Sequence, residues 1–315
     1  MKRQTKDLLL ISNEWLSFKE LYIKQSSYDK YQAIITNHLS LLFNENNNHY
    51  LTEKDITEFF LRKSKTECLS LNTLKSIITV LKAILQYAHH EHNYPVVSFT
   101  YIRLTSLPRK EVKPLDKISQ QIIIDHCMKN KNTSSFAILL ALYGGLRLGE
   151  ICALKWQDID YSSKYIIVSK TVKRVVNRQD NLKNKTKLII DIPKTNSSNR
   201  IVVIPNILLD YFYNYLKDNI DNQEAYILSN KSKIPDPRTL QLQYKRICKL
   251  YNIDTNFHAL RHSYATNGVQ LGVDIKTLSE LLGHSSVNIT LNRYVHSALE
   301  YKLNQINKLN NPSLS

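Results

Sequence analysis

Four short segments in the second half of the chain bring together side chains that bind anions, transfer protons or act as nucleophiles. They are 144–150, 193–200, 258–262 and 282–296. Arginine pairs with phosphate oxygens and keeps its charge, lysine and histidine transfer protons, and a tyrosine oxygen can attack phosphorus. Each residue type is common by itself, so the signal lies in their joint occurrence in this order. We expect the four segments to form one site.

The local sequence around these residues predicts how they are held. Gly144 and Gly145 stop an apolar helix, and the resulting turn presents Arg147 between two helices. Lys194 begins a turn between two strands. The pair at positions 258 and 261 is three residues apart and shares one face of a helix. The segments therefore combine turns and helices on a mixed background of helices and strands.

The histidines also allow a metal-binding interpretation, because His258 and His262 have the four-residue spacing of ligands on a helix. Two observations disfavour it. No glutamate follows His258, as a metalloprotease helix requires, and Arg261 would place a permanent positive charge beside the metal ion. We therefore predict no metal site and no cofactor, and we interpret His262 as a packing residue behind the active face.

Taken together, the segments resemble those of the tyrosine recombinases, the family of phage integrases and related transposon and chromosome-resolving enzymes. The resemblance covers nearly the whole chain and is closest to integrases of phages and conjugative transposons. The residues that match the family's six active-site positions are Arg147, Lys194, His258, Arg261, His284 and Tyr294. Glu150 matches an acidic residue that supports the first arginine in many members.

The resemblance implies DNA cleavage and rejoining through a 3′-phosphotyrosyl intermediate. Tyr294 would be the nucleophile, and nearby cations must favour its ionised form because a phenol has a reference pKa of about 10. Arg147 and Arg261 suit the charge that develops on the non-bridging phosphate oxygens. By the same resemblance, Lys194 is the general acid for the departing 5′ oxygen. The two active-site histidines would handle protons or hold the phosphate, and the sequence does not divide those roles.

The charge of the chain agrees with this chemistry. It has 43 Lys+Arg against 27 Asp+Glu, a formal net charge of +16. Such an excess indicates a polyanionic partner, here double-stranded DNA. The stretch 170–187, basic and rich in asparagine, is either an extended hairpin that touches DNA or a solvated loop. The residues that we predict to contact DNA are Arg103, Arg109, Lys170, Arg174 and Arg200.

Cysteine spacing and hydropathy indicate the compartment. Four dispersed cysteines with no CxxC pair are typical of free thiols in a reducing environment. No apolar stretch is long enough to span a bilayer. We expect a cytoplasmic protein that does not contact the membrane.

The periodicity of apolar residues predicts a mainly α fold with a small β-sheet (α+β). In 71–88, apolar residues recur at three- and four-residue steps, which is one face of a helix. Weaker versions of this pattern lie at 7–24, 28–43 and 53–64. We therefore predict a helical bundle in residues 1–106, which the resemblance implies is the core-binding domain.

The remaining chain predicts a linker and a catalytic domain. Residues 107–114 are polar and bracketed by prolines, which is typical of a linker. Residues 115–315 mix helices with strands and end in a helix at 297–309. The predicted strands are 165–168, 188–190 and 201–204.

We predict a site-specific recombinase that integrates and excises a mobile element as a tetramer on DNA. The C-terminal helix either links neighbouring subunits or folds back on its own domain, and an accessory DNA-bending or directionality protein is a further possible partner. The alternatives are a chromosome-dimer resolvase, a DNA invertase, a type IB topoisomerase and a DNA-binding regulator with a decayed site. The filled active-site positions disfavour the regulator, and the short spacing from His284 to Tyr294 disfavours the topoisomerase.

Overall fold

The computed structural model describes residues 7–46, 50–100, 102, 104, 113–178, 185–192, 199–215, 222–294 and 306. The chain divides into two compact units, one of residues 1–111 with 175–186 and one of residues 112–174 with 187–315. A separate buried hydrophobic cluster lies in each unit. Helices dominate and the β-sheets are small, as the sequence predicts.

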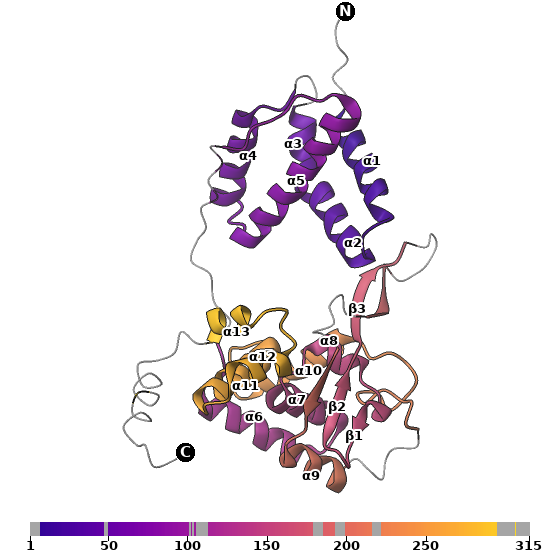
Figure 1. The fold of residues 1–315 in the computed structure, drawn as a ribbon, viewed down its shortest axis with the longest axis vertical. Helices are drawn as coiled ribbons and strands as arrows, with labels where there is room; N and C mark the ends of the chain where they lie inside the picture. The colour runs from indigo at the N-terminus through magenta and orange to yellow at the C-terminus, as the bar shows by residue number, and fades with distance from the viewer. Residues whose placement is uncertain are drawn as a thin grey trace, which may run out of the picture. The chain divides into compact units, whose positions relative to one another are not determined.

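The first unit is built mainly from helices packed side by side (Figure 1). Its helices within the described residues are α1 (Leu8–Glu20), α2 (Gln25–Ile34), a π-helix (Ile35–Leu39), α3 (Ser40–Glu45), α4 (Glu53–Lys65) and α5 (Leu71–His92). The buried face of α5 includes Leu74, Ile77 and Leu81, at the spacing read from the sequence. Asn93 ends this helix with a left-handed backbone, φ 53°.

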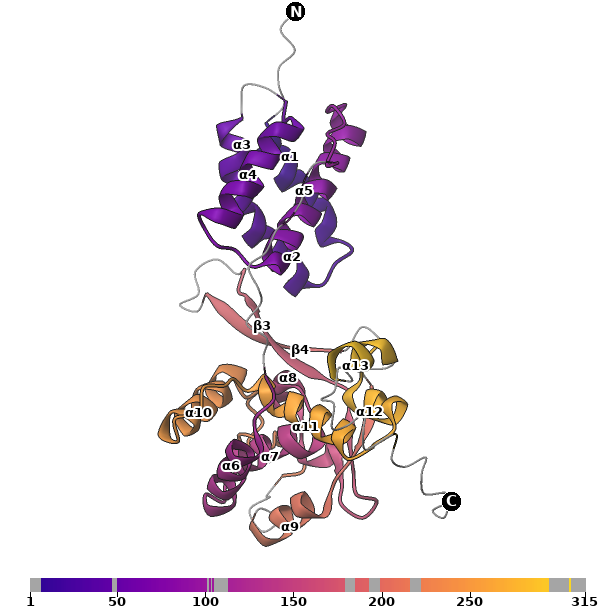
Figure 2. The same ribbon diagram turned by 90° about the vertical axis from the view of Figure 1, so that its left-hand side faces the viewer.

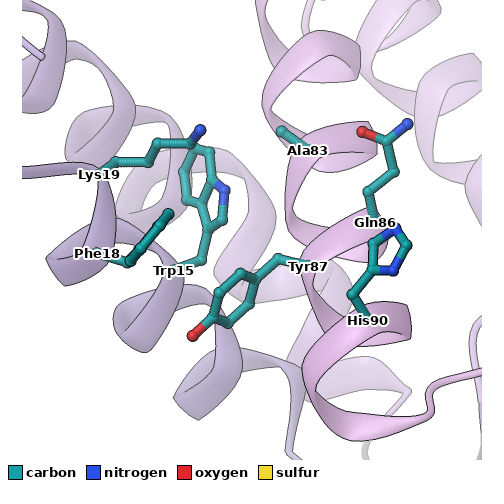
Figure 3. A pocket seen from close by; sticks show the side chains of 7 residues that line it. All are labelled: Trp15, Phe18, Lys19, Ala83, Gln86, Tyr87 and His90. Atoms are coloured by element: carbon teal, nitrogen blue, oxygen red, sulfur yellow. The ribbon is translucent and has the colours of Figure 1, made fainter. Parts of the chain in front are cut away.

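Aromatic side chains line a groove between α1 and α5 (Figure 3). Trp15 is only 3% exposed, whereas Phe18 is 46% exposed, and the ring centroids of Phe18 and Tyr87 lie 6.1 Å apart. The residues around the groove include Trp15, Phe18, Lys19, Gln86, Tyr87 and His90. Aromatic packing therefore joins the first and last helices of this unit.

The same unit includes part of the basic stretch 170–187. Arg178 forms ion pairs with Glu20 and Asp29, and its guanidinium lies 3.8 Å from the centroid of the Tyr28 ring. The positive charge of Arg178 is therefore matched by carboxylates of the protein itself.

The second unit mixes helices with strands. Its helices within the described residues are α6 (Lys117–Lys129), α7 (Thr133–Gly144), α8 (Leu148–Ala153), a 3-10 turn (Trp156–Asp158), α9 (Asn206–Tyr215), α10 (Pro237–Leu250), α11 (His258–Gln270), α12 (Ile275–Leu282) and α13 (Val287–Tyr294). One sheet has the strand order β1 (Ile159–Asp160), β2 (Tyr165–Val168), β5 (Arg200–Val203), with antiparallel pairs. Strands β3 (Thr171–Val176) and β4 (Thr186–Asp191) pair separately (Figure 2).

Helix α7 is the centre of the second unit. Its own residues are apolar on all sides and nearly all of them are buried, which is typical of a helix inside a core. Helix α11 packs against α7, and α12 and α13 pack against α11. This packing brings the ends of α7 and α12 close to α11, and the site forms there.

The stretch 170–187 contains all of β3, which the sequence did not predict as a strand, and the start of β4. The two strands pair, which agrees with the hairpin alternative, and its contact with DNA stays a prediction. The alternation of apolar residues in β3 is weak, because two consecutive polar residues, Lys173 and Arg174, separate Val172 from Val175. Within the described residues, no helix has the length and apolar character needed to cross a membrane.

Candidate active site

Two glycine turns and helix α11 form the frame of the candidate site. Gly145 follows α7 with φ 65° and Gly283 follows α12 with φ 61°, a backbone region that favours glycine. Arg261 of α11 joins the two turns: it donates one hydrogen bond of 2.6 Å to the Gly145 carbonyl and another of 2.6 Å to the Leu282 carbonyl. The residue is 2% exposed. Contacts within the protein therefore fix the position of the Arg261 guanidinium.

Glu150 of α8 links two further arginines. Arg147 donates to the Glu150 carboxylate through its side chain and its backbone N–H, both at 2.8 Å. Its other terminal nitrogen donates to the Gly283 carbonyl at 3.1 Å. Arg200 binds the same carboxylate through two hydrogen bonds of 3.1 and 2.9 Å, and its Nε donates to the Leu281 carbonyl at 2.7 Å. One carboxylate thus orients two cations.

The pKa values follow from burial and from these charges. Burial alone would raise the pKa of Glu150, but hydrogen bonds and charge from Arg200, together with the charge of Arg147, lower it to about 2. Burial and repulsion by Arg147 lower the pKa of Arg261 to about 9. Glu150 is therefore ionised and Arg261 protonated at neutral pH. Three guanidinium charges stand against one carboxylate, and this positive surplus suits a phosphate.

Tyr294, at the end of α13, lies among histidines. Its phenolic oxygen is 3.1 Å from Nδ1 of His262. The ring of His284 is parallel to the tyrosine ring, with 6.4 Å between centroids, and Nδ1 of His284 lies 2.8 Å from Oγ1 of Thr290. Arg147 and Arg261 bond to the carbonyls of Gly283 and Leu282, which directly precede His284 in the chain. The phenol and the arginines therefore belong to one site.

The structure brings most of the predicted active-site residues together. Those that gather are Arg147, Arg261, His284 and Tyr294, with Glu150 beneath them. His258 is exposed at the start of α11, and its ring centroid lies 4.6 Å from that of His262. Lys194 lies outside the described residues.

The structure argues against the predicted contact of Arg200 with DNA. Its side chain is 6% exposed and all of its bonds are made inside the protein. The reason is its position in β5, where buried and exposed residues alternate, so that Arg200 shares the inward side with Val202. Arg200 is therefore part of the support of the site.

The other predicted DNA contacts stay predictions. Lys170 is exposed, and Arg174, 25% exposed, forms an ion pair with Asp236. Arg103 and Arg109 lie outside the described residues.

The expectation for His262 also needs correction. It is buried, as a packing residue would be, but it contacts the phenolic oxygen of Tyr294. A signal was present in the sequence, because a residue four positions after His258 lies on nearly the same helix face. For Arg200 no such local signal exists, since Glu150 is 50 residues away in the chain.

A phenol beside clustered guanidinium groups suits phosphoryl transfer, and comparisons with known proteins identify the family. The profile of the Phage integrase family matches residues 107–300. A XerC-like tyrosine recombinase of Caldanaerobacter subterraneus is 32% identical over 260 residues, 76% of this chain and 66% of that protein. The ICEBs1 integrase of Bacillus subtilis is 26% identical over 90% of this chain and 77% of its own length.

A solved structure of the Tn1549 transposon integrase in complex with transposon right end DNA has a similar fold. The TM-score is 0.76 at 21% identity, over 96% of this chain and 99% of that chain. The chain belongs to the phage integrase family of tyrosine recombinases. These are enzymes that cleave and rejoin DNA strands in site-specific recombination.

Proposed function

We propose that Tyr294 attacks a DNA phosphorus atom and becomes joined to the 3′ phosphate. Its oxygen–phosphorus bond forms as the bond to the 5′ oxygen breaks, which conserves the bond energy for rejoining. Arg147 and Arg261 stabilise the charge on the non-bridging oxygens, each worth about 3–4 kcal/mol by analogy with donors in other enzymes. The gathering of both arginines and the phenol in one site carries this proposal.

We further propose the proton transfers on the leaving side. Lys194 donates a proton to the departing 5′ oxygen, which is a poor leaving group without one. His284 lies beside the nucleophile and His258 at the edge of the site, which supports roles in holding the phosphate. The reaction needs no external energy source, because each broken phosphodiester bond is replaced by a phosphotyrosyl bond.

The test captures the substrate and the intermediate together. The full-length protein is incubated with nicked duplexes that carry a randomised core, so that cleavage releases a short fragment and traps the adduct. Duplexes that stay bound in denaturant are amplified and selected again. We expect wild-type protein to enrich a defined sequence, here called the captured duplex, and Tyr294→Phe to give no adduct. An adduct of equal yield in Tyr294→Phe would refute the assignment of the nucleophile.

We propose that the reaction serves the integration and excision of a mobile element. Support comes from the fold similarity to the Tn1549 transposon integrase and from the match to the ICEBs1 integrase. The captured duplex should then occur at the junctions of a DNA element that carries this gene. A host-chromosome site without flanking element genes would instead favour a chromosome-dimer resolvase, and the match to XerC-like and XerA recombinases keeps that alternative in view.

The proposed DNA partner also makes predictions about architecture. Residues 1–106 would bind DNA together with residues 115–315, the stretch 107–114 would be the linker, and the helix at 297–309 would join subunits of a tetramer. The net charge of +16 supports binding to phosphates, so affinity should fall steeply with salt. Truncation after residue 296 should leave DNA cleavage by single subunits but abolish assembly into tetramers, measured by light scattering. A truncated protein that still forms tetramers would refute the role of the helix.

A further inference from the structure

His262 is the residue of α11 that meets the nucleophile. Its Nδ1 lies 3.1 Å from the phenolic oxygen of Tyr294, and the ring centroids are 5.6 Å apart. Both side chains are buried, His262 at 3% and Tyr294 at 9% exposure. Bulk water therefore has little access to the shared hydrogen, and a proton that leaves the phenol needs an acceptor within the protein.

The neighbouring groups are less suited to accept that proton. Arg147 and Arg261 are cations at neutral pH and present donors only. Nδ1 of His284 is engaged with Oγ1 of Thr290 at 2.8 Å, and its ring lies parallel to the tyrosine ring, 6.4 Å away. His258 is exposed and contacts His262 edge to face, at 4.6 Å between centroids. His262, by contrast, has a ring nitrogen 3.1 Å from the phenolic oxygen.

The position of His262 is fixed by its neighbour in the chain. Arg261 ties α11 to the Gly145 and Leu282 carbonyls, so the helix cannot turn without breaking two buried hydrogen bonds. On the far side of α11, the Ser263 hydroxyl accepts a hydrogen bond of 2.8 Å from the backbone of Leu115. The two bonds of Arg261 therefore fix the helix at His262, and the Leu115 contact adds stability without touching the site.

We propose that His262 is the general base that activates Tyr294. The proposal rests on the proposed function and adds its first proton transfer. In the neutral tautomer that carries its proton on Nε2, Nδ1 accepts the phenolic proton while the tyrosine oxygen bonds to phosphorus. The bond to the 5′ oxygen breaks, and that oxygen takes a proton from the general acid. In rejoining, His262 returns its proton to the phenolic oxygen as the phosphotyrosyl bond breaks.

The test compares two replacements of His262 in single-turnover cleavage of the captured duplex. Asparagine places an amide near the position of Nδ1, so it keeps a hydrogen bond to Tyr294 but cannot take up a proton. Alanine removes both the hydrogen bond and the proton acceptor. General-base catalysis contributes about 10²–10⁴-fold to a rate, so we expect His262→Asn and His262→Ala both to be at least about 100-fold slower than wild type. A His262→Asn rate within about threefold of wild type would show that the residue only orients the phenol and would overturn the proposal.

A second substrate distinguishes proton removal from the nucleophile from proton donation to the leaving group. In a captured duplex with sulfur in place of the 5′ bridging oxygen, the leaving group needs no proton. The variant of the proposed acid, Lys194→Ala, should regain its rate on this substrate, whereas the His262→Asn deficit should persist. Recovery of His262→Asn on the sulfur substrate would place the histidine on the leaving side and refute the base assignment.

A matched variant controls for damage to α11. Ser263→Ala changes a buried neighbour that faces Leu115, so it should lower stability while cleavage stays within about threefold of wild type. All variants are compared at equal occupancy of the captured duplex. A wild-type protein that forms no adduct would refute the proposed function itself, whereas an active wild type with an equally active His262→Asn would refute this inference alone.

Discussion

The two sides of the candidate site are held in different ways. On the phosphate-binding side, Arg261 and Arg147 are tied to backbone carbonyls and to the Glu150 carboxylate. On the nucleophile side, Tyr294 has a neutral hydrogen bond to His262 and a parallel contact with His284. Buried ion pairs are costly to break, and neutral hydrogen bonds less so. The protein thus holds the two arginines through strong ionic and hydrogen-bond contacts and holds the nucleophile Tyr294 through weaker ones.

The largest expected effect comes from Glu150, the anion of the phosphate-binding side. Glu150→Gln leaves the buried Arg200 without its counter-ion, and breaking a buried pair costs about 3–5 kcal/mol. Denaturant unfolding should show this loss of stability. In double-mutant cycles with Arg200→Met and Arg147→Met, the coupling of Glu150 should be larger with Arg200, because the Arg147 side chain is 38% exposed. Equal couplings would contradict the view that Arg200 is the main support.

The next effect is on the rate. Arg261→Lys keeps a charge but replaces a planar fork, so one of the carbonyls of Gly145 and Leu282 loses its donor. We expect cleavage of the captured duplex to fall by about 10²–10³-fold. Arg238→Lys, a change of the same type at α10, is the control. A fall of less than about tenfold at Arg261 would mean that the fixed guanidinium is not needed for catalysis.

The third effect is on the pH dependence of stability. The pKa of Glu150 is about 2 when folded and 4.5 in its ordinary range, so its contribution is complete above pH 4.5 and lost as pH falls towards 2. The difference of about 2.5 pKa units corresponds to about 3 kcal/mol. The gap in unfolding free energy between wild type and Glu150→Gln should shrink by about this amount from pH 5 to pH 2. A gap that does not change with pH would show that the carboxylate is not stabilised by its arginines.

The smallest effect tests the nucleophile side. Thr290→Val removes the hydroxyl that bonds to Nδ1 of His284, inside a fully buried position. Loss of one neutral hydrogen bond costs about 1 kcal/mol, so thermal unfolding should shift modestly and the cleavage rate should fall only a few-fold. A loss as large as that of Glu150→Gln would erase the contrast between the two sides.

Local patterns made much of the fold readable from the sequence. The apolar face of 71–88 appears in α5 because helical periodicity depends on neighbours three and four positions apart. Gly144 and Gly145 end α7 as predicted, since the left-handed turn is a property of glycine itself. The strands at 165–168 and 200–203 were readable from β-branched residues, whereas β3 was obscured by its polar side chains.

The sequence by itself determined the residue types of the site and the family that they indicate. Only the tertiary structure decided that Arg200 supports Glu150 instead of facing solvent, and that His262 meets Tyr294 across 32 residues of chain. The physical reason is that charge, helix pattern and turn chemistry act between near neighbours in the chain. Local spacing places His262 near the helix face of His258, but which side chain it meets across the core depends on the packing of α7, α11, α12 and α13.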